Sequence, residues 1–105
     1  MVSSPSVFVH QGKIEKAVSR AAKALAPDVV RIRYSLGEDW MGSGAVFFRV
    51  LLSDNASRPS NLGDISARVR STVYEAVKPD ELGLQWYFNF RSASEQAELK
   101  EPIWA

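Results

Sequence analysis

The sequence predicts an α+β fold in which two helices pack on one face of a small sheet. Two segments, 11–26 and 61–78, repeat apolar residues at the spacing that lines one side of a helix. Three segments, 29–36, 45–53 and 84–91, alternate apolar and polar residues, which is the period of a strand with one buried face. Elements that are apolar on one side bury those sides against each other, so a two-layer sandwich is the economical arrangement.

The first helix is expected over residues 11–26. Its apolar side consists of small and branched residues, and Pro27 cannot continue the helix. The opposite side carries a basic stripe, which we interpret as a solvated helix face, made of Lys13, Lys16, Arg20 and Lys23.

The next two strands are expected to form an antiparallel pair, because a short loop over residues 38–44 joins them. Glycines at positions 37, 42 and 44 favour a turn there. Strand periodicity then predicts which side chains face the helices, namely Val30, Ile32, Tyr34, Leu36, Val46, Phe48, Val50 and Leu52.

The second helix is expected to begin after Asn61, which is a good N-cap residue, and to end before Pro79. It must cross over to the third strand, which is rich in aromatic residues. Ser92 and Glu95 form a capping-box pattern, so a short helix should follow that strand and lead into a tail at 102–105.

A further strand over Ser6 to Val9 would make the element order βαββαβ, which resembles the ferredoxin-like fold with an antiparallel-rich sheet. Without that strand, the order αββαβ is similar to ribosome-binding factor A and to relatives of the type II KH domain. The GxxG clamp of RNA-binding KH domains and the signatures of RNA-recognition motifs are missing from this sequence. The resemblance therefore implies a fold and no function.

The length of 105 residues predicts a single domain over 1–105, with its core at 11–92 and a C-terminal helix and tail at 93–105. The absence of cysteine excludes disulfides and cysteine metal sites. No apolar run is long enough for a membrane span, and residues 1–6 do not resemble a signal peptide. We therefore expect a cytoplasmic location.

Few residues could carry catalysis. His10 is the only histidine, and its short N-terminal setting favours an ordinary surface residue. Glu38, Asp39 and Asp54 could contact a hard cation, but their spacing matches no established metal-binding motif. We expect no catalytic residue, no metal and no cofactor.

The sheet face turned away from the helices is the most informative predicted surface. It should carry four arginines that are candidate contacts for RNA or another anion, Arg31, Arg33, Arg49 and Arg91. The same face could bind a second copy or another protein, or it could simply be solvated. The charge distribution adds a further hint, because residues 1–37 are basic and residues 80–105 are acidic, so complementary fields could bring partners together.

Aromatic side chains outside the predicted core suggest a protein interface, because Trp and Tyr are typical interface anchors. The candidate interface residues are Trp40, Phe47, Tyr74, Tyr87 and Trp104. The expected function is that of a non-catalytic domain acting through protein contacts, either self-association or docking on a larger partner. The alternative is an RNA-binding module that uses the arginine-rich sheet face.

Overall fold

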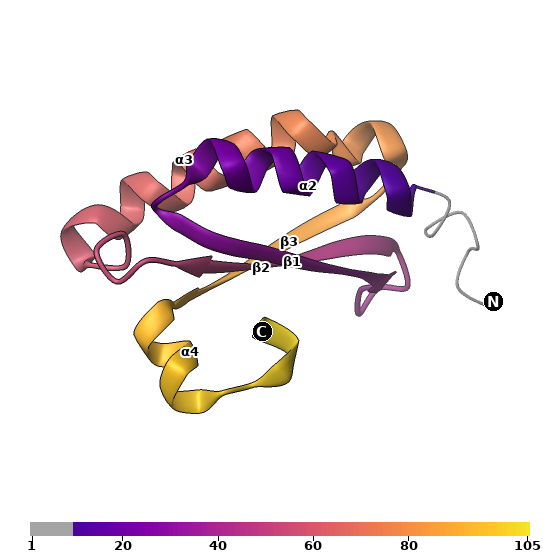
Figure 1. Ribbon diagram of the computed structural model, residues 1–105. Helices are drawn as coiled ribbons and strands as arrows, with labels where there is room; N and C mark the ends of the chain where they lie inside the picture. Colours follow the sequence, from indigo (N-terminus) through magenta and orange to yellow (C-terminus); the bar gives the residue numbers. More distant parts are fainter. Residues whose placement is uncertain (1–9) are drawn as a thin grey trace.

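Two helices cover one face of a three-stranded sheet in the computed structural model of the protein, which describes residues 10–105 (Figure 1). The α+β architecture expected from the sequence is confirmed. The candidate strand at Ser6 to Val9 lies outside the described residues. The elements in chain order are α2 (Gln11–Leu25), β1 (Val29–Glu38), β2 (Gly44–Leu52), α3 (Pro59–Val77), the 3-10 turn η1 (Pro79–Leu82), β3 (Gln85–Ser92), α4 (Ala93–Leu99) and the 3-10 turn η2 (Pro102–Trp104).

The sheet is mixed, with the strand order β1-β2-β3. β1 and β2 form the expected antiparallel pair, whereas β2 and β3 run parallel because α3 crosses over between them. The ferredoxin-like order is matched only in part, since the described sheet has three strands and β2 pairs directly with β3. β1 and β3 are therefore the edge strands among residues 10–105.

The core lies between the sheet and the two helices. β2 is the central strand, and its helix-facing Val46, Phe48 and Val50 are fully buried against the apolar sides of α2 and α3. The expected inward position of Val30 is wrong: Val29 is 3% exposed and Val30 is 51% exposed. A β-bulge between Val29 and Arg31 supplies the physical reason, because one extra residue in a strand reverses which face its neighbours occupy.

The start of α3 also differs from the expectation. The helix begins at Pro59 rather than after Asn61, and Arg58 is its N-cap residue. Proline is favourable at the first helical position because its missing N–H would have no partner there. The Asn61 side chain instead donates a hydrogen bond of 2.8 Å to the Asn55 carbonyl oxygen in the preceding loop.

The chain after β3 forms a third layer beneath the sheet (Figure 1). The predicted capping box is confirmed, since the Ser92 side chain accepts from the Glu95 amide and the Glu95 side chain accepts from the Ser92 amide. Residues 102–105, expected as a tail, include the turn η2 and fold back against the sheet. We refer to residues 93–105 as the C-terminal segment.

Candidate functional site

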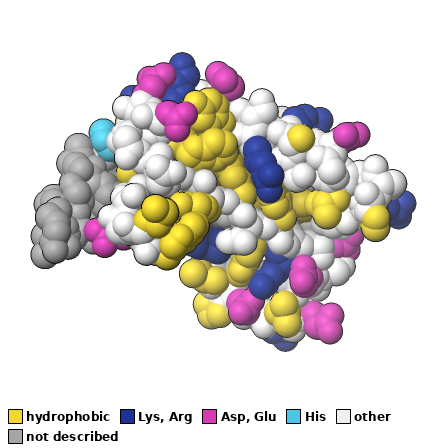
Figure 2. Space-filling model, turned by 180° about the vertical axis from the view of Figure 1, so that it is seen from behind, with side chains coloured by type: hydrophobic (Ala, Val, Ile, Leu, Met, Phe, Trp, Pro, Cys, Tyr) yellow, Lys and Arg dark blue, Asp and Glu magenta, His cyan; other side chains and the backbone are white. Residues whose placement is uncertain are grey.

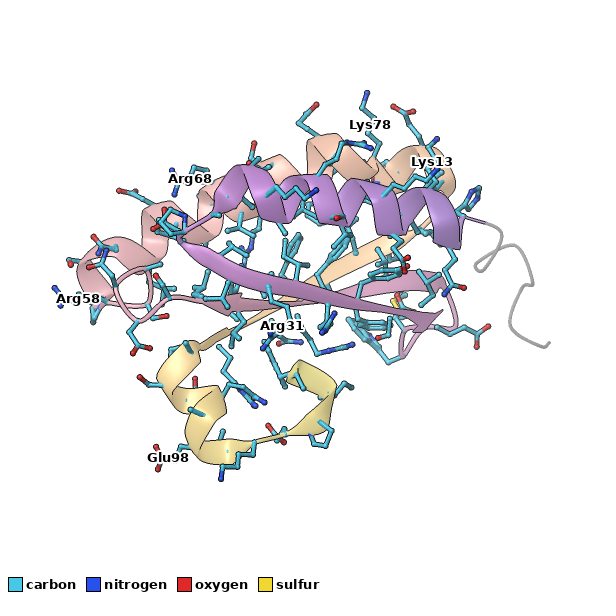
Figure 3. The ribbon with its side chains drawn as sticks, viewed as in Figure 1. Lys13, Arg31, Arg58, Arg68, Lys78 and Glu98 are labelled. Atoms are coloured by element: carbon cyan, nitrogen blue, oxygen red, sulfur yellow. The ribbon has the colours of Figure 1, made fainter. Side chains whose placement is uncertain are left out.

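The sheet face turned away from α2 and α3, called here the outer face, carries the arginines that strand periodicity places there. Figure 3 shows Arg31 on this side of β1, between the sheet and the C-terminal segment. The structure divides the outer face into two parts. The C-terminal segment covers one part, and aromatic side chains beside the β1–β2 turn occupy the other.

Two arginines hold the end of the C-terminal segment by hydrogen bonds. Arg49 Nε donates to the Ile103 carbonyl oxygen at 3.1 Å, and Arg49 Nη1 donates to Ser35 Oγ at 3.1 Å. Arg33 Nε donates to a backbone oxygen of Ala105 at 2.5 Å. Burial lowers the pKa of Arg49 from its usual value, because a charged guanidinium loses solvation beneath the segment.

Arg91 joins β3 to the same segment through three contacts. It forms an ion pair of 2.5 Å with Glu101, and its Nη1 donates to Gln96 Oε1 at 3.0 Å. Its guanidinium carbon also lies 4.6 Å from the centre of the Trp104 ring, which is cation–π geometry. Trp104 is only 7% exposed, so this candidate interface residue is part of the internal contacts of the fold.

These contacts affect whether the outer-face arginines can bind RNA. Arg33, Arg49 and Arg91 already donate to groups of the C-terminal segment, so an RNA phosphate would have to displace that segment. Arg31 Nε is buried and has no hydrogen-bond partner within residues 10–105. The C-terminal segment therefore lies on the outer-face arginines, and its one ion pair with them joins Glu101 to Arg91.

The β1–β2 turn is organised by the buried carboxylate of Asp39. Its Oδ1 accepts hydrogen bonds from the backbone amides of Met41 at 2.9 Å and Ser43 at 3.0 Å. Its Oδ2 accepts a hydrogen bond of 2.7 Å from the Tyr87 hydroxyl group on β3. Gly42 has a φ of 80°, a conformation that few other residues adopt without strain. The turn is thus tied both to itself and to the far strand of the sheet.

These hydrogen bonds shift two pKa values. The pKa of Asp39 is lowered, chiefly because the Tyr87 hydroxyl stabilises the carboxylate and secondarily because two backbone amides do so. The pKa of Tyr87 is raised, chiefly because its proton is shared with the Asp39 carboxylate. Asp39 is therefore an ionised structural group rather than a poised general acid or base.

Two large apolar side chains project from this organised turn. Trp40 is 79% exposed and Met41 is 77% exposed. The Trp40 ring lies 5.3 Å from the Tyr87 ring, which in turn stacks on Phe47 at 5.4 Å with an interplanar angle of 19°. We call these four side chains the turn cluster. Met41 is not recognisable as a site residue from the sequence, because a methionine in a loop carries no periodic or motif signal.

Tyr74, the remaining candidate interface residue, lies elsewhere. It projects from α3 against Trp86 of β3, with the ring centres 5.1 Å apart, and its hydroxyl donates to Asp80 Oδ2 at 2.6 Å. The structure therefore brings three of the five candidates together, Trp40, Phe47 and Tyr87, and separates Tyr74 and Trp104 from them.

A groove of about 580 Å³ lies between α2 and the edge of β1, and the residues that line it include Glu15, Arg31 and Tyr34. Among residues 10–105, no group of three or more histidine and acidic side chains is placed to hold a metal ion. The helices in the same part of the chain are too short or too polar to cross a membrane.

No family model matches this chain, and no curated protein matches it significantly in sequence. Among the surfaces of the protein described above, the turn cluster combines exposure, apolar character and a fixed backbone, the three features that a docking site needs.

Proposed function

We propose that this chain is a non-catalytic domain that binds a protein partner through the turn cluster. The observation that carries the proposal is the exposure of Trp40 and Met41 on a turn whose backbone is held by Asp39. Large apolar side chains are costly to leave in water, and burial by a partner would recover that free energy.

The construction of the turn supports binding rather than accidental exposure. The Asp39 side chain binds the backbone amides of Met41 and Ser43, which follow Trp40, and Tyr87 and Phe47 provide an aromatic support beside the Trp40 ring. A site that is already ordered loses less conformational entropy when a partner binds. Trp is enriched among residues that dominate binding energy, and the flexible Met side chain adapts to the shape of the partner.

The competing function, RNA binding through the outer-face arginines, receives less support. Single-stranded RNA sites need guanidinium groups free for phosphates and aromatic rings free for bases. In this structure three arginines are engaged by the C-terminal segment, and Trp104 of that segment is itself buried. The exposed Trp40 ring of the turn cluster packs against Tyr87, whose hydroxyl group binds the acidic Asp39.

Site-specific photo-cross-linking tests the proposal. Replacement of Met41 by photo-methionine should give a covalent adduct with a protein in a lysate of the source cells, and the Trp40→Ala substitution should abolish that adduct. The matched control places photo-methionine at Leu99, an exposed apolar position on α4. An adduct of equal yield from both positions, or one that survives Trp40→Ala, would contradict docking through the turn cluster.

A further inference from the structure

Among the described residues, one edge of β3 is an unprotected hydrogen-bonding edge. Within residues 10–105, β3 pairs with β2 on one side and with no strand on the other. Its first six residues, Gln85 to Phe90, contain four aromatic rings and no charge or proline, and its register with β2 shows no bulge. Soluble proteins usually protect such edges with charges, prolines or bulges, because bare edges pair with other strands.

The other edge strand of the same sheet carries the usual protection. β1 contains a bulge between Val29 and Arg31 and bears the charged side chains of Arg31 and Arg33. A bulge disrupts the regular spacing of backbone donors and acceptors, and charges oppose the approach of a like strand. The contrast between the two edges marks β3 as the one available for pairing.

The helix-facing side chains of β3 are also incompletely covered. Trp86, Phe88 and Phe90 point toward the helix layer, yet each is only half-buried. Arg70 of α3 lies across two of them, 5.5 Å from the Phe90 ring and 6.0 Å from the Phe88 ring. Figure 2 shows hydrophobic side chains exposed across the middle of the face seen from behind, interrupted by a basic side chain.

From these observations we propose that two copies of the chain associate by antiparallel pairing of their β3 strands. The favoured register places Phe88 on the two-fold axis, opposite Phe88 of the second copy. Trp86 of each copy then lies opposite Phe90 of the other, so that aromatic residues face aromatic residues on the helix side. The product is a continuous six-stranded sheet whose two remaining edges are the protected β1 strands.

The charges around β3 fit this register. Arg70 lies over Phe90, and within one copy it also lines a shallow depression together with Tyr74, Asp80 and Trp86. Because the register places Phe90 of one copy opposite Trp86 of the other, it brings the two depressions close together, so that Arg70 and Asp80 can pair between copies as well as within one. On the outer face, Gln85 lies opposite Arg91 and Tyr87 lies opposite Asn89, so no like charges are directly opposed.

The molar mass in solution tests the association. Sedimentation equilibrium of the full chain should give twice its 11.7 kDa, with a monomer–dimer equilibrium at lower concentration. Arg70→Glu should weaken the dimer by about tenfold or more, because it sets a carboxylate against Asp80. The charge swap Arg70→Glu with Asp80→Lys should restore association. Arg20→Glu, the same charge change on exposed α2, is the matched control and should leave the dimer intact.

A single mass of 11.7 kDa at all accessible concentrations would overturn the proposal. So would a dimer whose dissociation constant is the same for wild type, Arg70→Glu and Arg20→Glu. The charge variants lie on exposed helix positions, so a change in mass cannot be attributed to loss of the core.

Single-cysteine variants test the register, since the natural chain contains no cysteine. Phe88→Cys should form an intermolecular disulfide under mild oxidation, because residues opposite each other across an antiparallel pair bring their Cβ atoms within disulfide range. Asn89→Cys, one position away and opposite Tyr87, should cross-link far more slowly. The reverse order of rates would rule out this register. The dimer contacts do not use Trp40 or Met41. A result that rules out the dimer therefore leaves partner binding by the turn cluster untouched, and the reverse also holds.

Discussion

The hydroxyl group of Tyr87 donates a hydrogen bond of 2.7 Å to the carboxylate of Asp39, and this contact ties the edge strand β3 to the turn between β1 and β2. The same Tyr87 ring lies between Trp40 and Phe47. One side chain therefore fixes both the backbone of the turn, through Asp39, and the position of the exposed indole.

The hydrogen bond from Tyr87 predicts how the Asp39 carboxylate titrates with acid. Asp39 has a lowered pKa in the folded protein, so its ionised form contributes stability that is present above its ordinary value of 3.8. That contribution is lost as the pH falls through the lower folded-state pKa. Nuclear magnetic resonance of the Asp39 side-chain carbonyl carbon should show a midpoint below 3.8, with a change in Trp40 fluorescence over the same range.

Tyr87→Phe is the matched variant for that titration, since it removes only the hydroxyl that is the main cause of the shift. The Asp39 midpoint should move up toward 3.8 while the ring contacts with Trp40 and Phe47 are kept. Identical midpoints in the wild type and in Tyr87→Phe would show that the hydrogen bond does not control the turn.

Substitutions in the core and in the turn should differ in their effect on the free energy of unfolding. Phe48→Ala removes a side chain that is fully buried in the central strand, so we expect a loss of about 3–5 kcal/mol in the free energy of unfolding. Trp40→Ala removes an exposed side chain, and its effect should stay within about 0.5 kcal/mol. Denaturant unfolding of both variants gives the comparison. A large loss for Trp40→Ala would mean that its ring serves the fold rather than a partner.

Two neighbouring residues of the C-terminal segment, one buried and one exposed, should also differ in their effect on stability. Trp104 is buried against Arg91, whereas the neighbouring Ile103 is 58% exposed. Trp104→Ala should therefore lower the free energy of unfolding by on the order of 3 kcal/mol, and Ile103→Ala should lower it by well under 1 kcal/mol. Equal small effects in thermal unfolding would indicate that the segment is not packed on the sheet in solution.

RNA binding offers a further prediction. Engagement of Arg33, Arg49 and Arg91 by the C-terminal segment leads us to expect no salt-dependent binding of single-stranded RNA by the intact chain. If four free arginines contacted phosphates of a single-stranded RNA, the release of counterions would weaken binding as salt is added. The logarithm of affinity would then fall with the logarithm of salt concentration with a slope of about −3. Fluorescence anisotropy with a labelled oligonucleotide distinguishes the two results. A slope near −3 that disappears in Arg33→Ala/Arg49→Ala would revive the RNA function.

Local patterns predicted most of the helix and strand boundaries because each element is amphipathic and its period is visible in the sequence. The errors have local causes that periodicity does not register. The bulge after Val29 reverses the strand parity at Val30, and Pro59 starts a helix that Asn61 was expected to cap. The parallel pairing of β2 and β3 depends on the crossover of α3, which is a tertiary property.

The candidate site was predictable only in its residue types. Trp40, Phe47 and Tyr87 were identifiable as aromatics without a place in the core, yet their association depends on the register between β2 and β3. The role of Asp39 was not predictable, because its partner Tyr87 is 48 positions away in the chain. Likewise, nothing in the sequence shows that the acidic C-terminal segment folds back over the arginines.

A comparative pull-down tests whether the turn cluster binds a protein partner. The tagged wild type, Trp40→Ala/Met41→Ala and the control Leu99→Ala/Ile103→Ala would be used as baits in nuclease-treated lysate of the source cells, and retained proteins would be quantified by mass spectrometry. The control removes two exposed apolar side chains of the C-terminal segment. We predict a protein that is retained by the wild type and the control and lost with Trp40→Ala/Met41→Ala. Retention of the same proteins in equal amounts by all three baits would contradict the account.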